Sequence, residues 1–153
     1  MMRSPFYSCQ VEAGAEFIEK GGRLLVVKYS DPLDEYRAVR ETAGMIDYST
    51  MTEFEIKGPD ARSFLQYLIV NDVERLDHGD VLYSTMCNEN GGILDDTTIY
   101  CFTKEHYWLV GSSAGRARTA KWLEDKSKGW QVCVTDLTSA WALIALQGPN
   151  SRK

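Results

Sequence analysis

One face of a predicted hairpin in the middle of this sequence carries a single carboxylate among phenol rings and hydroxyl groups. Two runs with strand-like alternation flank an Asn-Gly-Gly turn signal, so they are expected to pair as a β-hairpin. One side of this hairpin is expected to carry Asp96 together with Tyr83, Thr85, Thr98 and Tyr100. Tyrosines supply rigid apolar area with a polar tip, and a carboxylate accepts protons or hydrogen bonds from ring nitrogens. The pattern therefore indicates a surface for a flat, polar heteroaromatic ligand, and the alternative is an ordinary half-exposed sheet face with a solvated aspartate.

The composition of the two hairpin faces depends on the turn. A type I′ turn with Asn90 and Gly91 at its centre predicts the cross-strand pairs Tyr83–Thr98, Thr85–Asp96 and Cys87–Leu94. The first face then holds Tyr83, Thr85, Leu94, Asp96, Thr98 and Tyr100, and the second holds Ile93, Asp95, Thr97, Ile99 and Cys101. A turn shifted to Gly91 and Gly92 keeps these faces, whereas a three- or five-residue loop reverses them. Asp95 is expected to be structural or solvated.

The remaining candidates for chemistry are few. The four cysteines are far apart and form no CxxC pair, and the only histidines are His78 and His106, so no metal site is predicted. Cys87 and Cys101 are expected to be wall or core residues, because no histidine accompanies them as a base. Together the cysteines indicate reduced thiols in a cytoplasmic protein.

Charge and hydropathy argue against a nucleic-acid-binding protein and against a membrane-spanning one. The chain has 153 residues, a net charge of −5 and a pI near 5.1, and its Lys and Arg residues are scattered. This distribution argues against a nucleic-acid partner, which needs clustered phosphate neutralisation. No apolar run approaches the roughly 18 residues of a membrane-spanning helix, and the first residues lack the apolar core of a signal peptide. A cytoplasmic protein without a membrane partner is expected.

The elements that position the hairpin follow a recognisable order. Strand, helix, strand, strand, strand, helix, strand is expected from residue 52 to about 134, with the first helix placing Ala61, Phe64, Leu65, Leu68 and Ile69 at a 3.6-residue period. The predicted fold class is α+β, with a mostly antiparallel sheet, helices on one face and a ferredoxin-like βαβββαβ theme. Tryptophans 108, 122, 130 and 141 are expected in the core.

The segments on either side predict a second domain. A helix over 11–19, a strand over 23–29 and a helix from Pro32, N-capped by Asp31, are expected before residue 50. Leu146-Gln-Gly-Pro-Asn150 echoes Lys57-Gly-Pro-Asp60 as a strand-to-helix junction. The predicted organisation is residues 1–50 in a first, incomplete domain, 51–138 as a ligand-pocket domain, and 139–153 as a truncated return into the first domain.

Five motifs are spaced through nearly the whole chain: Ala38–Ser49, Lys57–Ala61, Asn71–Val73, Tyr83–Asp96 and Leu146–Pro149. Together and in this order they resemble the glycine-cleavage T-protein (aminomethyltransferase) family, of which the chain looks like the N-terminal part. That family also includes the folate-binding portions of dimethylglycine and sarcosine dehydrogenases and folate-dependent demethylases.

The resemblance implies a ring-shaped, three-domain, tetrahydrofolate-dependent one-carbon transferase with the folate in its central hole. It aligns Asp96 with the family's principal catalytic residue, and Met51, Tyr83, Thr98 and Tyr100 with positions that line the pterin pocket. The implied partners are a lipoyl carrier protein, whose aminomethyl group loses ammonia as its carbon is transferred, or a small methylated donor. Further folate contacts, an acidic residue and a clamping arginine, are expected after Lys153, so the remainder of the enzyme would complete the site.

Three places depart from the glycine-cleavage pattern. Thr50 stands where the family often has histidine, and the segments Gly22–Val26 and Val110–Ser112 also differ. These differences leave the donor open between an aminomethyl-lipoyl group and a methyl donor. The alternative function is a non-catalytic folate-binding module related to iron–sulfur-assembly proteins, although such proteins generally lack the Asp-Asp hairpin.

Overall fold

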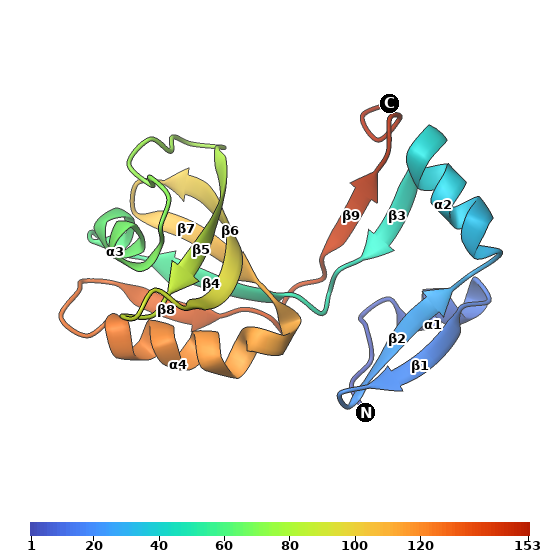
Figure 1. The fold of residues 1–153 in the computed structure, drawn as a ribbon, viewed down its shortest axis with the longest axis horizontal. Helices are drawn as coiled ribbons and strands as arrows, with labels where there is room; N and C mark the ends of the chain where they lie inside the picture. The colour runs from blue at the N-terminus through green and yellow to red at the C-terminus, as the bar shows by residue number, and fades with distance from the viewer. The chain divides into compact units, whose positions relative to one another are not determined.

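The computed structural model describes residues 1–153, which form two compact units. Unit 1 comprises Met1–Thr50 with Ala142–Lys153, and unit 2 comprises Met51–Trp141. Figure 1 shows the elements of each unit along the chain. The assignment of these parts as domains with separate roles stays a prediction.

Unit 2 is built on one antiparallel sheet. Its elements are β4 (Thr52–Lys57), α3 (Ala61–Leu68), β5 (Val81–Cys87), β6 (Ile93–Thr103), β7 (His106–Gly111), the 3₁₀ turn η1 (Ser113–Gly115), α4 (Arg116–Lys126) and β8 (Cys133–Asp136). The strands lie in the order β5-β6-β7-β4-β8, and all neighbours are antiparallel. The predicted α+β class and the predicted βαβββαβ order are confirmed.

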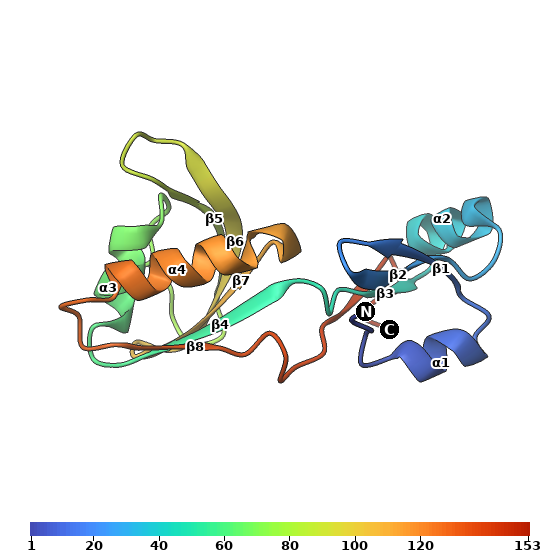
Figure 2. The ribbon, with the colours of Figure 1, turned by 90° about the horizontal axis from the view of Figure 1, so that it is seen from below.

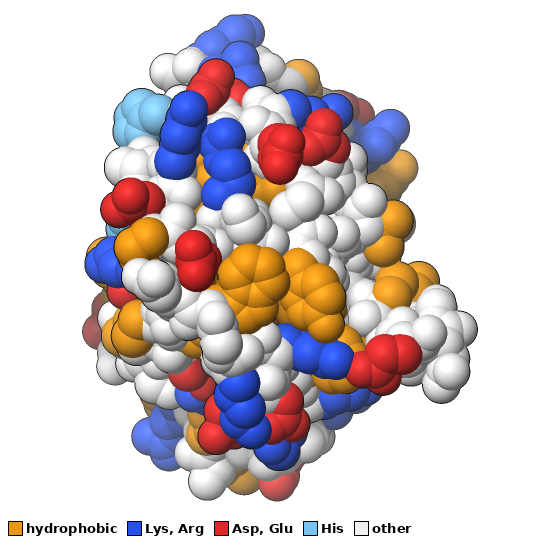
Figure 3. Space-filling model, turned by 90° about the vertical axis from the view of Figure 1, so that its left-hand side faces the viewer, with side chains coloured by type: hydrophobic (Ala, Val, Ile, Leu, Met, Phe, Trp, Pro, Cys, Tyr) orange, Lys and Arg blue, Asp and Glu red, His pale blue; other side chains and the backbone are white.

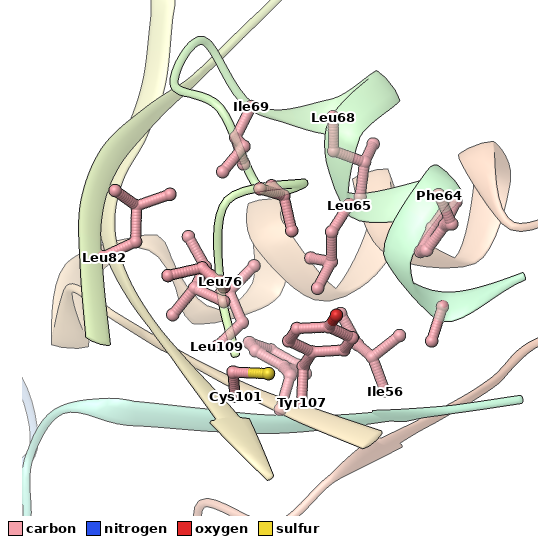
Figure 4. Close-up of a cluster of buried hydrophobic side chains, with 14 of the residues drawn as sticks. Ile56, Phe64, Leu65, Leu68, Ile69, Leu76, Leu82, Cys101, Tyr107 and Leu109 are labelled. Atoms are coloured by element: carbon pink, nitrogen blue, oxygen red, sulfur yellow. The ribbon is translucent and has the colours of Figure 1, made fainter. Parts of the chain in front are cut away.

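Both helices of unit 2 cover the same face of this sheet (Figure 2). Alternation along the strands turns one set of side chains toward the helices, as the period of two requires. In the core, Phe64 and Leu65 from α3 and Leu123 from α4 pack with Ile56 and Leu109 from the sheet, and all five are fully buried. Figure 4 shows this cluster between α3 and the strands. The opposite face of the sheet carries no helix, and we call it the helix-free face.

A glycine-proline turn joins β4 to α3. Gly58 has φ 141°, a conformation that L side chains rarely adopt, and an added Cβ would lie 2.1 Å from the Gln131 carbonyl oxygen. The expected helix start at Asp60 is correct, but its carboxylate does not cap the helix and instead accepts a 2.8 Å hydrogen bond from the Gln131 amide. The turn is therefore fixed by its contact with the segment before β8.

Unit 1 holds two short antiparallel pairs. Its elements are α1 (Tyr7–Glu12), β1 (Glu16–Lys20), β2 (Arg23–Lys28), α2 (Pro32–Glu41), β3 (Gly44–Asp47) and β9 (Ile144–Gln147), with β1 paired to β2 and β3 paired to β9. The helix predicted over 11–19 is wrong, because the helix ends at Glu12 and Gly14 turns the chain at φ 78° into a strand. The predicted strand from Arg23 and the helix from Pro32 are confirmed.

Each unit contains one Gly-Pro turn, at Gly58 in unit 2 and at Gly148 in unit 1, and the two turns have similar backbone geometry. Gly148 has φ 135°, and its added Cβ would lie 2.4 Å from the Thr42 carbonyl oxygen. That oxygen accepts a 2.9 Å hydrogen bond from the Asn150 amide, as the Gln131 oxygen accepts one from the Asp60 amide in unit 2. The repeated sequence motif therefore builds the same turn twice.

Candidate functional site

The predicted ligand face lies on the helix-free face of unit 2. Strand pairing sets Tyr83 opposite Thr98, Thr85 opposite Asp96, and Tyr100 opposite Val81. Residues that alternate with them, such as Leu82, Met86 and Ile99, are buried against the helices. The structure therefore brings Tyr83, Asp96, Thr98 and Tyr100 onto one exposed or half-exposed face, and their role in binding stays a prediction.

The hairpin turn differs from the predicted type I′ turn. The Asn88 amide donates to the Gly92 carbonyl at 2.9 Å and the Gly91 amide donates to the Asn88 carbonyl at 3.0 Å, which closes a three-residue loop. Gly91 takes φ 79°, so the loop is a type I turn followed by a left-handed residue. Such a loop alone would reverse the faces.

A β-bulge restores the predicted register. Cys87 pairs with Ile93, and the next pair along β5 is Met86 with Asp95, so one residue of β6 is left over. The loop and the bulge each shift the pairing by one position in opposite directions, and the pair Thr85–Asp96 results. The predicted pair of Cys87 with Leu94 is wrong for the same reason.

The bulge also changes the side chains around Leu94. Leu94 was predicted beside Asp96, but it is half-buried and packs against the core cluster. The alternation predicts Ile93 on the second face, whose other four members are buried in the structure, but Ile93 is exposed. These two corrections are confined to the bulged residues, where alternation fails.

Asp96 and Tyr83 form the centre of the candidate site. The Tyr83 hydroxyl donates a 2.9 Å hydrogen bond to Asp96 Oδ2, and Asp96 Oδ1 has no hydrogen-bond partner in the chain. Tyr83 is 63% exposed and Tyr100 is 36% exposed, so both rings are available to a ligand. Accepting this bond and carrying a negative charge, Asp96 raises the pKa of Tyr83 above its ordinary value. Asp96 is itself exposed.

Glu53, which no sequence motif singles out, lies in the same row of cross-strand neighbours as Tyr83 and Thr98. Pairing connects Tyr83 to Thr98, Thr98 to Val110, and Val110 to Glu53 on four neighbouring strands. Glu53 is 3% exposed, and neither carboxyl oxygen has a hydrogen-bond partner. Burial, and next the charge of Asp136, raise the pKa of Glu53 to about 7, while Arg116 opposes them. Alternation along β4 places Glu53 on this face, but nothing in the sequence signals its burial.

Met51 directly precedes β4 and is half-buried. Further along the helix-free face, Trp108 makes edge contacts with Phe102 at 5.3 Å and Trp141 at 5.1 Å between ring centroids. Trp141 is 52% exposed and Trp108 lies outside the core cluster, so the prediction that these two are core residues is wrong, whereas Trp122 and Trp130 pack against the core. The face therefore carries an aromatic group beside the polar one.

Features of three other kinds, namely metal sites, disulfides and membrane-spanning helices, are absent from the chain. No group of three or more His, Cys, Asp and Glu side chains lies close enough to hold a metal ion, and all four cysteines are free thiols. None of the helices has the length and apolarity needed to span a bilayer. On the face drawn in Figure 3, basic and acidic side chains are interspersed around a small group of hydrophobic rings.

A cavity of about 800 Å³ lies in unit 1 between residues of β2, α2 and β3. Asp47 borders it and accepts hydrogen bonds from Gln10 Nε2 at 2.7 Å, the Ser49 amide at 2.9 Å, and the Ser4 hydroxyl. Burial raises the pKa of Asp47, but these hydrogen bonds outweigh burial and the net pKa is lowered. None of the five predicted site residues lines this cavity.

Comparisons with known proteins agree on one family. The profile of the family described as "GCVT N-terminal domain" matches residues 6–153. Aminomethyltransferases of Desulfitobacterium hafniense (strain Y51) and of Thermotoga maritima are 37% and 39% identical to this chain over 153 residues. In each case the match covers 100% of this chain and 42% of the relative.

Solved structures give the same result. The crystal structure of glycine cleavage system aminomethyltransferase T from Bartonella henselae has a TM-score of 0.87 and 32% sequence identity, covering 98% of this chain and 41% of that one. The chain thus spans about 42% of the length of the curated relatives that it matches. The matched residues include both strands of the hairpin and the whole of unit 2. The chain belongs to the GCVT N-terminal domain family.

Proposed function

We propose that this chain provides the folate-facing part of a tetrahydrofolate-dependent one-carbon transferase. Asp96 is the proposed catalytic residue, and Met51, Tyr83, Thr98 and Tyr100 are the proposed pterin-lining residues. The single observation that carries the proposal is the exposed carboxylate of Asp96, held by the Tyr83 hydroxyl at 2.9 Å on a face with a second tyrosine. The aminomethyltransferase names of the relatives support the same reaction class.

The residues of this face fit a pterin in chemical type. A pterin is flat and carries ring nitrogens that donate and accept hydrogen bonds, and the face offers two exposed phenol rings beside a carboxylate. The Thr98 hydroxyl adds a donor and acceptor next to Tyr83. Tetrahydrofolate supplies the nitrogen that receives the one-carbon unit.

The residues of the chain then have distinct tasks. Asp96 Oδ2 is occupied by the Tyr83 hydroxyl, which fixes the carboxylate, while Oδ1 remains able to accept a proton or a hydrogen bond from a ring nitrogen. Tyr83 and Tyr100 provide apolar area on which the pterin ring packs. By holding the folate nitrogen in one orientation, the fixed Asp96 carboxylate would lower the activation barrier of the reaction between the folate and the one-carbon donor.

The proposed donor is an aminomethyl group on a lipoyl carrier protein or a small methylated compound. Thr50, in place of the family's frequent histidine, directly precedes Met51, so donor choice is proposed to involve this segment. We also propose that residues 51–138 form the folate-pocket domain and that residues 1–50 and 139–153 belong to a second domain.

An Asp96→Asn variant of the full-length protein tests the proposal. Transfer is measured as methylenetetrahydrofolate formed from an aminomethyl-lipoyl carrier, and as methyltetrahydrofolate formed from a methylated amine. We expect a loss of about 100-fold or more in kcat, because the acceptor for the proton is removed. Asp125→Asn on the outer surface of α4 is the matched control, and its rate is expected to equal that of the wild type.

Calorimetry with tetrahydrofolate separates binding from catalysis. Tyr83→Ala and Tyr100→Ala are each expected to weaken binding by about 10-fold, as loss of a stacked ring of this size implies. Near-normal turnover of Asp96→Asn would remove Asp96 from the mechanism. Tight folate binding by a wild-type protein that transfers nothing from either donor would instead establish the non-catalytic folate-binding module.

A further inference from the structure

Helix α4 holds the hairpin loop and the first residues of β6 at three points. Lys126 Nζ lies 2.6 Å from Glu89 Oε1 in the loop, and the Arg118 guanidinium donates to the Leu94 carbonyl oxygen. The Thr119 hydroxyl donates a 2.9 Å hydrogen bond to Asp95 Oδ2. The first two contacts are exposed, but the third is buried, so it is the least screened by water.

The carboxylate of Asp95 is closely enclosed. Asp95 is 4% exposed, and its Oδ1 accepts a 3.3 Å hydrogen bond from the Ser112 amide. An added Cβ at Gly111 or at Gly115 would lie 2.8 Å from Asp95 Oδ2, so the absence of both side chains makes room for this carboxylate. A buried carboxylate needs such partners, because an unpaired one costs several kcal/mol or is neutralised.

Asp95 directly follows Leu94, the unpaired residue of the β6 bulge, and directly precedes the candidate catalytic residue. The register changes between the pairs Met86–Asp95 and Cys87–Ile93. The ladder resumes at the pairs Met86–Asp95 and Thr85–Asp96, but a bulge interrupts it just before them, so tertiary contacts help to hold β6 where these pairs begin. At this bulge, the buried contact from another element is the one between Thr119 and Asp95.

We propose that Asp95, anchored by Thr119, is a positioning residue that directs the neighbouring Asp96 carboxylate toward the Tyr83 hydroxyl. The two adjacent aspartates thus have opposite tasks on opposite faces of one strand. Asp95 locks β6 to α4 on the helix side, and Asp96 meets the ligand on the helix-free face. The consequence for catalysis rests on the proposed function, whereas the consequence for the geometry of Asp96 and Tyr83 does not.

The geometric part is tested by following the ionisation of Tyr83. Tyrosine labelled at Cζ with ¹³C is titrated by NMR, with Tyr83→Phe used to assign its signal. The hydrogen bond to Asp96 raises the pKa of Tyr83, so Asp96→Asn gives the reference shift downward. Thr119→Val removes the hydroxyl at nearly constant volume, and we expect it to give at least half of that reference shift. Thr119→Ser keeps the hydroxyl and is expected to titrate as the wild type.

Two further variants perturb the Asp95 carboxylate without changing Thr119. Asp95→Asn removes its charge with little change of shape. Gly111→Ala puts a methyl group against Oδ2 in a strand residue that needs no unusual φ. Both are expected to lower the pKa of Tyr83 as Thr119→Val does. An unchanged Tyr83 titration in Thr119→Val and Asp95→Asn would overturn the proposal and leave Asp95 as a packing residue.

Kinetics of the full-length protein separate this proposal from the proposed function. Thr119→Val and Asp95→Asn are expected to lower kcat about 10-fold to 100-fold with less than a twofold change in KM for tetrahydrofolate, because the acceptor is misplaced while the rings still bind. Thr119→Ser should restore kcat. If Tyr83 responds as expected and the wild type transfers no one-carbon unit, the positioning role is supported and the proposed function fails.

Discussion

Units 1 and 2 both combine strands with helices, but they stabilise their helices by different means. In unit 2, α3 buries four residues and α4 buries two, and neither helix has a side-chain N-cap hydrogen bond. In unit 1, α2 buries none, yet Asp31 caps it by accepting from the Leu33 amide at 2.8 Å. The Glu35 carboxylate adds hydrogen bonds from the amides of Tyr29 at 2.7 Å and Ser30 at 2.6 Å.

The difference extends to the interior of each unit. Every buried hydrophobic side chain belongs to unit 2, whereas Gln10 is the single buried residue of unit 1. Burial of apolar area is the main favourable term in folding, so unit 2 has the greater intrinsic stability. The candidate site therefore lies on the better stabilised unit, where packed elements hold its side chains in place.

Removal of a core ring should produce the largest contrast between the units. Phe64→Ala is expected to cost about 3–5 kcal/mol in the free energy of unfolding, because Phe64 is fully buried and packs near Trp130. The matched change Tyr36→Ala, on the exposed α2, should cost no more than about 0.5 kcal/mol. Urea unfolding followed by tryptophan fluorescence measures the loss in unit 2, since all four tryptophans lie in it, and hydrogen exchange of the α2 amides measures the loss in unit 1. Equal losses would contradict the comparison.

The two Gly-Pro turns offer a pair with the same geometry in different surroundings. Gly58→Ala should cost about 2–4 kcal/mol, because its φ of 141° and the Gln131 carbonyl oxygen both exclude a Cβ. Gly148→Ala meets a similar obstacle at the Thr42 carbonyl oxygen, but in unit 1. Fluorescence-detected unfolding should therefore respond to the first variant and not to the second. A shift with Gly148→Ala would show that the turn in unit 1 supports the core of unit 2.

The stability of unit 2 is expected to depend on pH through Glu53. Its folded pKa is raised to about 7, so the folded state holds a proton that the unfolded state releases near pH 4.5. Unit 2 should therefore lose about 2 kcal/mol of stability as the pH rises from about 5 to 8. Glu53→Gln should unfold like the wild type at pH 5 and be more stable at pH 8. Parallel pH curves for the two proteins would show that Glu53 ionises freely in the folded state.

The hairpin shows why its faces were predictable while its turn was not. Alternation of apolar residues, such as Leu82, Met86 and Ile99, determines which side of each strand is buried. The register follows that burial. The three-residue loop shifts the pairing by one residue, and the bulge in β6 shifts it back, so the buried side chains stay on the helix side. The motif Asn-Gly-Gly is compatible with more than one type of hairpin turn. The turn type therefore depends on the register of the folded sheet and cannot be predicted from the local sequence.

The roles of Asp95, Glu53 and Trp141 could not be read from their neighbours in the sequence. Thr119, which binds Asp95, is 24 residues away on another element. Glu53 occupies a position that alternation assigns to the polar face, and only the folded sheet shows its burial. The residue type of Trp141 predicts a core position, but residue type alone gives no information about its place in the fold. In contrast, Asp31 followed by Pro32 predicted a helix start correctly, because that signal is complete within a few residues.

The cap of α2 should give the smallest of these effects and the most local one. Asp31→Ala removes the acceptor for the Leu33 amide and should destabilise α2 by about 1 kcal/mol, which corresponds to roughly fivefold faster hydrogen exchange of its amides. Asp60→Ala is the matched change in unit 2, where the carboxylate binds the Gln131 amide and not the helix terminus. If local signals specify α2 and packing specifies α3, the first variant should accelerate exchange in its own helix alone. The second should leave α3 protected by its buried face, and its effect should appear in fluorescence-detected unfolding. Rapid exchange throughout α3 in Asp60→Ala would show instead that unit 2, like unit 1, depends on its helix ends.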